Sequence, residues 1–280
     1  MPLLPLGLVV LSAFLHAAWN ALLKRHARPE AAARSIMVGS CLLALAAALA
    51  LPRGPWFPQA RSLAWTALAG AFEGAYFIAL ARALASAPLG TAYAVMRGGA
   101  TLLVWPLSIL LLGERVTALG LGSVLLMGAG IALLGSGDLR RSPGAGLAWS
   151  FAGAACVAGY HLAYKQALAL GALPLPLFAA SVGTASLLRL GLDALRPPPP
   201  GPRFAWGGAV PLAVLGCTAS FGLFLWALRL GGAGLTLSLR NTSLVFAQLL
   251  ALGLGERPTA RQWAAVGLLS LGAVGLGVAR

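Results

Sequence analysis

The phrase LGERVT at Leu112–Thr117 returns, as LGERPT, at Leu254–Thr259. The glutamates of the two copies, Glu114 and Glu256, are 142 positions apart in a chain of 280 residues. The stretches that follow each copy also agree in length and in the spacing of their glycines. A phrase that recurs after about half the chain predicts two copies of one structural unit.

The composition is typical of a membrane protein. Hydrophobic residues make up 59% of the chain, charged residues make up 9%, and the mean hydropathy is +0.87. Soluble domains have about 45–50% apolar and about 25% charged residues. Ten apolar runs have about the length that a helix needs to cross a bilayer. They cover residues 3–23, 35–52, 62–81, 89–112, 117–135, 145–164, 174–192, 207–228, 232–254 and 260–279. The alternating pattern of a membrane barrel is absent. We therefore expect an all-α polytopic membrane protein with ten transmembrane helices.

The two halves correspond beyond the repeated phrase. The matched positions are Arg82 and Arg229, Arg97 and Arg240, Trp19 and Tyr160, and Asn20 and His161. We therefore expect two five-helix repeats, residues 1–138 and 139–280. Because five is odd, the second repeat enters the membrane from the opposite side, as in the inverted repeats of many secondary transporters. A site between two such halves can open to either side in turn, which is alternating access.

The formal net charge of +14 does not indicate nucleic-acid binding. Most basic residues stand at the ends of the apolar runs, as membrane topology favours, and no exposed domain remains to carry a basic face. The three cysteines, Cys41, Cys156 and Cys217, lie far apart without the spacing of a metal site. The paired catalytic set of an intramembrane enzyme is missing. We expect no enzyme activity, catalytic residue, metal, cofactor or nucleic-acid partner.

The motifs also resemble a known family. Two five-helix units, each closed by LGER(V/P)T and a glycine-rich helix, resemble the EamA-type members of the drug/metabolite transporter superfamily. The segments His16–Arg25, Ala92–Val104 and Leu239–Leu250 are similar to a bacterial EamA-like subgroup. In that subgroup an acidic residue is expected after the second-half arginine, where this chain has Asn241. The resemblance implies a multi-pass carrier in the inner (plasma) membrane with its N-terminus inside. The distribution of basic residues instead favours an N-terminus outside.

Glu73 lies near the middle of the third apolar run, in GAFEGAYFIAL. A charge at the bilayer centre costs about 2.5–3.5 kcal/mol on insertion scales, so it needs a partner or a water-filled cavity. Two interpretations stay open. One is a structural ion pair with a basic residue such as Arg97, and the other is a site for substrate or for a coupling proton. Tyr76 follows at helical spacing and shares the face of Glu73.

Arg97 and Arg240 occupy matched places early in the fourth and ninth runs. The symmetry axis of an inverted repeat would place them on opposite sides of one cavity. Arginine binds carboxylate or phosphate through two parallel hydrogen bonds, so the pair suits an anionic or zwitterionic solute. The alternative is that both side chains reach out to the lipid headgroups. Tyr93, one turn before Arg97, is expected on the same wall.

Polar and aromatic residues also share one face of the first run and one face of the sixth. His16, Trp19 and Asn20 are spaced by three or four residues, and Tyr160 and His161 correspond to them in the second half. Such a face on an apolar helix is typical of a cavity lining, and interfacial anchoring is the alternative. The glutamates of the two LGER phrases are expected to face the headgroups or to pair locally within their turns.

These observations favour a secondary transporter for a small polar metabolite, with amino acids or organic anions as the preferred class. Two alternatives stay open: a carrier or exporter of organic cations and amines that uses Glu73, and a lipid-linked flippase subunit of the same fold. The expected partners are the small-molecule solute, a coupling proton and the lipid bilayer. The protein is expected to be a monomer or a weak dimer.

Overall fold

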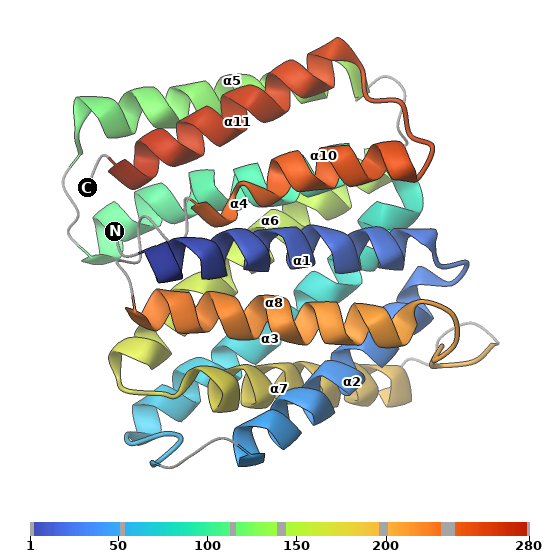
Figure 1. Cartoon of the computed structure of the whole chain (residues 1–280), viewed down its shortest axis with the longest axis vertical. Coiled ribbons are helices and arrows are strands. Elements are labelled where there is room, and N and C mark those ends of the chain that lie inside the picture. Colours follow the sequence, from blue (N-terminus) through green and yellow to red (C-terminus); the bar gives the residue numbers. More distant parts are fainter. Residues whose placement is uncertain are drawn as a thin grey trace.

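The structure, a computed structural model, describes residues 3–50, 54–112, 116–138, 144–195, 201–230 and 239–278. In these ranges it contains ten α-helices and no strand (Figure 1). The helices are α1 Leu3–Arg25, α2 Pro29–Ala50, α3 Ala60–Ser86, α4 Leu89–Leu112, α5 Ala118–Asp138, α6 Gly144–Ala169, α7 Pro174–Leu195, α8 Val210–Leu230, α10 Ser243–Gly253 and α11 Ala260–Val278. Among them α1, α2, α3, α7 and α8 are long and apolar enough to cross a membrane. The all-α polytopic membrane fold is thereby confirmed.

Two of the predicted runs differ from the helices observed. The second run was expected to begin at residue 35, but α2 begins at Pro29 and includes the charged residues Glu30 and Arg34. The ninth run was expected to be continuous over 232–254, but a turn at Asn241–Thr242 precedes α10. Residues 231–238 of that run lie outside the described part of the chain.

The packing of the helices follows one pairing rule. In two five-helix repeats, α1–α5 correspond in order to α6, α7, α8, α10 and α11. Under this correspondence the contact of α3 with α6 is equivalent to the contact of α8 with α1. Likewise, the contact of α4 with α6 corresponds to that of α1 with α10, and the pairs α2–α7 and α5–α11 correspond to themselves. Figure 1 shows α5 and α11 side by side along one edge of the bundle, with α1 and α8 in its middle. This packing is consistent with repeats, although residues 139–143, at the expected boundary, are not described.

The helix that carries Glu73 approaches α7 very closely. A Cβ atom at Gly70 would meet the backbone carbonyl of Ser181, and one at Gly74 would meet the backbone of Ala185. Small residues are used at such positions in membrane helices because they let two backbones come together. The approach places Ser181 beside Glu73.

The second copy of the repeated phrase ends α10 with a left-handed glycine. Gly255 has φ of +78°, a conformation that costs other residues about 1–2 kcal/mol. The amide of Gly255 donates to the Leu252 carbonyl, and the amide of Glu256 donates to the Ala251 carbonyl, each at 3.0 Å. This pair of bonds is the Schellman motif, which satisfies carbonyls at a helix end. The Leu-Gly-Glu of the phrase is therefore a helix stop.

The threonine that closes the phrase starts the next helix. The Gln262 amide donates to Thr259 Oγ1 at 3.3 Å, and the Thr259 amide donates to Gln262 Oε1 at 2.7 Å. These reciprocal bonds form a capping box at the start of α11. In the first copy Thr117 Oγ1 accepts the Gly120 amide at 3.0 Å, while residues 113–115 lie outside the described part of the chain.

Glu256 does not pair within its own turn, so the expectation of a local pair was wrong for this copy of the phrase. Its two carboxylate oxygens each accept the amide of Leu89, at the start of α4, at 3.0 Å. Lys24 lies 3.9 Å from the same carboxylate and donates to the carbonyls of Leu84 and Ala87 at 2.7 and 2.6 Å. The Schellman turn thus aims a carboxylate at a helix N-terminus more than half the chain away, where negative charge is favourable.

We expect Gly255→Ala to destabilise the protein by about 1–2 kcal/mol, because alanine is strained at positive φ. The matched control is Gly253→Ala, two residues earlier in the last turn of α10. No atom lies within 4 Å of a Cβ added there, so this change should be neutral or stabilise by up to about 1 kcal/mol. Thermal unfolding of the purified variants measures both effects. Equal melting temperatures for the two variants would contradict the assigned role of Gly255.

Candidate functional site

The structure brings the residues expected at a site into one region at the centre of the bundle. All but His161 are buried, at no more than 4% exposure, and His161 is half-buried. They come from α1, α3, α4 and α6 and from the residue before the Asn241–Thr242 turn, and they are His16, Trp19, Asn20, Glu73, Tyr76, Tyr93, Arg97, Tyr160, His161 and Arg240. Ring contacts connect them: His16 lies 5.9 Å from Tyr93 between centroids, and Tyr76 lies 5.7 Å from Tyr160.

His16 accepts two hydrogen bonds at one ring nitrogen. Trp19 Nε1 lies 3.3 Å from His16 Nδ1, and Arg240 Nη2 lies 3.3 Å from the same atom. Because both groups are donors, Nδ1 must be the acceptor, and we infer that the ring proton is on Nε2. His16 Nε2 is buried and has no hydrogen-bond partner. The imidazole therefore holds Arg240 on one side and presents a free N–H on the other.

Arg240 is buried against two aromatic faces. Its guanidinium carbon lies 3.7 Å from the Phe224 ring centroid and 4.9 Å from the Phe221 centroid. Both rings come from α8, and such cation–π contacts stabilise a charge that has left water. The Nε and Nη1 atoms of Arg240 are buried without a hydrogen-bond partner. The aromatic faces therefore support the guanidinium and leave two of its nitrogens free.

Arg97 contributes a second guanidinium group to the same region. Its central carbon lies 5.9 Å from the Tyr93 ring centroid, and its Nη2 atom is buried without a hydrogen-bond partner. Neither arginine reaches out to the headgroups, because Arg97 is 4% exposed and Arg240 is 1% exposed.

Glu73 is held by two hydroxyl groups rather than by an arginine. Tyr164 donates to Glu73 Oε1 at 2.5 Å, and Ser181 donates to Glu73 Oε2 at 2.6 Å. Among the described residues, no ion pair within 4 Å joins Glu73 to Arg97. The interpretation of Glu73 as the ion-pair partner of Arg97 was therefore wrong, because its carboxylate faces α6 and α7.

Sequence reasoning missed the residues that hold the two charged groups in place. Tyr164 stands one helical turn after Tyr160, and Phe221 and Phe224 are spaced by three residues on α8. Both spacings place two aromatic rings on one face of a helix, so the sequence indicated these faces. Ser181 carried no such signal, because serine is common in membrane helices and only the approach of α7 to α3 brings it to Glu73.

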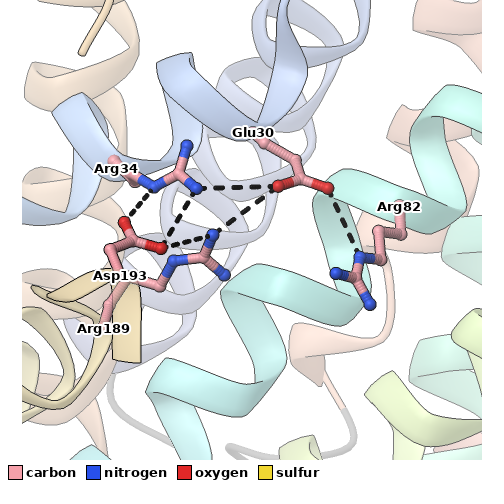
Figure 2. Close-up of polar contacts among 5 residues, drawn as sticks. All are labelled: Glu30, Arg34, Arg82, Arg189 and Asp193. Carbon is pink, nitrogen blue, oxygen red and sulfur yellow. Dashed lines mark hydrogen bonds and ion pairs between the residues drawn. The ribbon is translucent and has the colours of Figure 1, made fainter. Parts of the chain in front are cut away.

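A second polar cluster, the ion network, joins α2, α3 and α7 at one end of the bundle (Figure 2). Arg34 makes a two-point pair with Asp193 at 2.7 and 3.3 Å, and Arg189 lies 3.1 Å from the same carboxylate. Glu30 lies 3.6 Å from Arg189 and 3.3 Å from Arg82. The network explains why α2 begins six residues before the apolar run: its charged first turns have partners on α7 and α3.

The two acids of the ion network differ in exposure, which allows a matched test. The side chain of Asp193 is 5% exposed and that of Glu30 is 42% exposed. We expect Asp193→Asn to cost up to about 3–5 kcal/mol of stability, because the buried Arg34 then keeps only the exposed Glu30, 3.7 Å away, as its counter-charge. Glu30→Gln should cost less than about 1 kcal/mol. Melting temperatures of the two variants measure the difference, and equal losses would show that the buried pair does not stabilise the fold.

No group of three or more metal-binding side chains occurs within the described ranges. Comparison with known proteins gives two family matches. Residues 144–278 match the EamA-like transporter family, and residues 56–127 match the Small Multidrug Resistance protein family. No curated protein matches the chain.

The fold is also found among solved structures. A crystal structure described only as that of a protein aligns with 96% of this chain and 94% of its own length, with a TM-score of 0.62. At 20% identity this likeness shows the fold alone. The EamA-like family is a family of membrane transporters rather than of enzymes. The two family matches and the apolar helices are consistent with a multi-pass membrane transporter similar to the EamA-type members of the drug/metabolite transporter superfamily.

Proposed function

We propose that the protein carries a small organic anion or zwitterion, such as an amino acid, across the inner membrane by alternating access. The observation that supports this proposal is the pair of buried guanidinium groups of Arg97 and Arg240, which have no acidic partner within 4 Å among the described residues. Taking an ion of this size out of water costs several kcal/mol even after the protein relaxes. A bound anion would supply the missing counter-charge.

The unpartnered atoms around the arginines also favour an anionic group. Most of them donate hydrogen bonds: the free nitrogens of both guanidinium groups, the Nε2–H of His16 and the hydroxyl of Tyr160. A carboxylate accepts hydrogen bonds on both oxygens and can satisfy several donors at once. The Oδ1 atom of Asn20, which can only accept a hydrogen bond, is also free, and it suits an amino or hydroxyl group of the solute.

Glu73 is assigned the second role in the transport cycle. Its two oxygens are already held by Tyr164 and Ser181, so it is less available to a bulky cation than an unpartnered carboxylate would be. We propose that it exchanges the coupling proton or receives the amino group of a zwitterion when the site opens. Both alternatives require the carboxylate, because an amide at this position can do neither.

Alternating access would rest on the two repeats, residues 1–138 and 139–280. The helix contacts that occur in equivalent pairs support this division. The ion network and the bond from Leu89 to Glu256 lie at the same end of the bundle, where α1 ends and α2 begins. We propose that these contacts hold that end closed in the present conformation and separate when the carrier opens there.

The first test of the proposal is thermal stabilisation of the purified protein by organic acids, amino acids and amines. A ligand present at about 100 times its Kd stabilises the folded state by about 2.7 kcal/mol. We expect organic or amino acids to raise the melting temperature, and Arg97→Gln and Arg240→Gln to abolish the rise. Arg261→Gln is the matched control, because Arg261 is exposed at the start of α11 and should leave the rise unchanged.

The cation alternative gives the opposite result in the same experiment. If only amines or quaternary ammonium compounds stabilise the protein, and Glu73→Gln abolishes their effect, the solute is a cation and the proposal is wrong. Under the proposal, Glu73→Gln keeps the binding of an organic acid and loses proton-driven uptake in vesicles. Uptake driven by a solute gradient alone should survive in this variant, which separates loss of coupling from loss of folding.

A further inference from the structure

A long apolar groove opens on the outside of the bundle between α1, α8 and α10. Its volume is about 530 Å³, and six leucines dominate its lining: Leu15, Leu22, Leu212, Leu215, Leu250 and Leu254. Leu212 and Leu215 are 60% and 54% exposed, so the rim faces the surroundings of the bundle rather than its centre. Trp19 forms part of the lining and separates the groove from His16.

The length of the groove matches one leaflet of a bilayer. On α1 it extends from Phe14 to Arg25, eleven residues along the helix. At 1.5 Å per residue this is about 16 Å, roughly half of the hydrocarbon thickness of about 30 Å. Arg25 is the last residue of α1, so this end of the groove lies at headgroup level and the Phe14 end lies near the midplane.

Arg25 places a positive charge at the headgroup end of the groove. It is exposed, and none of the hydrogen bonds or ion pairs between described residues includes its side chain. None of the described residues that line the groove is acidic. The groove is lined by leucines, is as long as one leaflet is deep, and ends at a free guanidinium group. These features complement a hydrocarbon chain attached to a phosphate.

The corresponding helices of the two repeats form an equivalent groove without the charge. It lies between α6, α3 and α4, has a volume of about 370 Å³, and is lined by Ala155, Gly159 and Gln166 where the first groove has Phe14, Ala18 and Arg25. Phe72 of α3 lines it at the position where α8 has Ala219 in the larger groove. Gln166 removes the positive charge, and the Phe72 ring takes up space that Ala219 leaves open.

We propose that the groove between α1, α8 and α10 binds one acyl chain of an anionic phospholipid, whose phosphate pairs with Arg25. The equivalent groove takes an acyl chain without preference for headgroup charge, because Gln166 replaces the arginine. The selectivity for an anionic lipid therefore belongs to one of the two grooves. The bound chain packs against Trp19, the residue that also holds His16 in the central region.

Native mass spectrometry of the purified full-length protein tests this site. The protein is titrated with phosphatidylglycerol or with phosphatidylcholine of the same acyl chains. We expect one phosphatidylglycerol to bind more tightly than any phosphatidylcholine. One basic residue near a membrane surface contributes about 1 kcal/mol to binding of anionic lipid, so Arg25→Gln should weaken phosphatidylglycerol about fivefold. It should weaken phosphatidylcholine less, because the choline cation offsets the charge of that lipid's phosphate. Ala219→Phe should weaken both lipids, because it fills the groove as Phe72 fills the equivalent one.

Three controls make the result decisive. Arg28→Gln, in the same connection but outside the groove, should bind both lipids as the wild type does. Arg25→Lys should keep most of the preference for phosphatidylglycerol. The stabilisation by solute should persist in every variant, so failure here leaves the proposed transport function standing. An unchanged preference in Arg25→Gln, an equal loss in Arg28→Gln, or unchanged binding in Ala219→Phe would overturn the proposal.

Discussion

Two guanidinium groups lie at the centre of an apolar bundle, and the acids that would ordinarily neutralise them are bound elsewhere. The structure describes four acidic side chains, and each has other partners: Glu30, Glu73, Asp193 and Glu256. Three of them join helices at one end of the bundle, and Glu73 is held by hydroxyl groups. A buried charge without a counter-charge is costly. The aromatic faces around Arg240 and the His16 bond reduce that cost without removing it. We propose that this constraint gives the centre a preference for anions.

The repeated phrase supplies the mechanical frame around that charge. In its second copy the glycine ends α10, the threonine starts α11, and Glu256 accepts the amide of Leu89 in the first turn of α4. The same end of the bundle carries the ion network, in which Arg34 and Asp193 connect α2 with α7. Because α2 and α7 occupy equivalent places in the helix packing, these contacts lie where two equivalent units meet. A carrier that opens at this end must break several polar contacts. Each group can form its contact again with the same partner when the carrier closes.

The helices and the repetition were predictable from the sequence, because hydrophobic runs and a recurring phrase can be recognised without knowing how distant segments pack. Charges were harder to place. The apolar run placed the start of α2 at residue 35, since Glu30 and Arg34 appear unfavourable until their partners on α7 and α3 are known. Helical spacing put His16 and Trp19 on one face, as observed. It could not show that Glu73 turns toward Ser181, because that depends on how closely two distant helices approach. The functional role of these residues stays a proposal.

The central claim is that Arg97 and Arg240 together form an anion site between the two halves. Its most direct test needs no knowledge of the natural solute. Crystals of the protein grown in iodide would locate bound anions by anomalous scattering. The account predicts one strong peak in contact with both guanidinium groups, and its loss in crystals of Arg240→Gln. Iodide bound to surface arginines with no peak at the centre would contradict it, because the buried charges would then have a counter-charge of another kind.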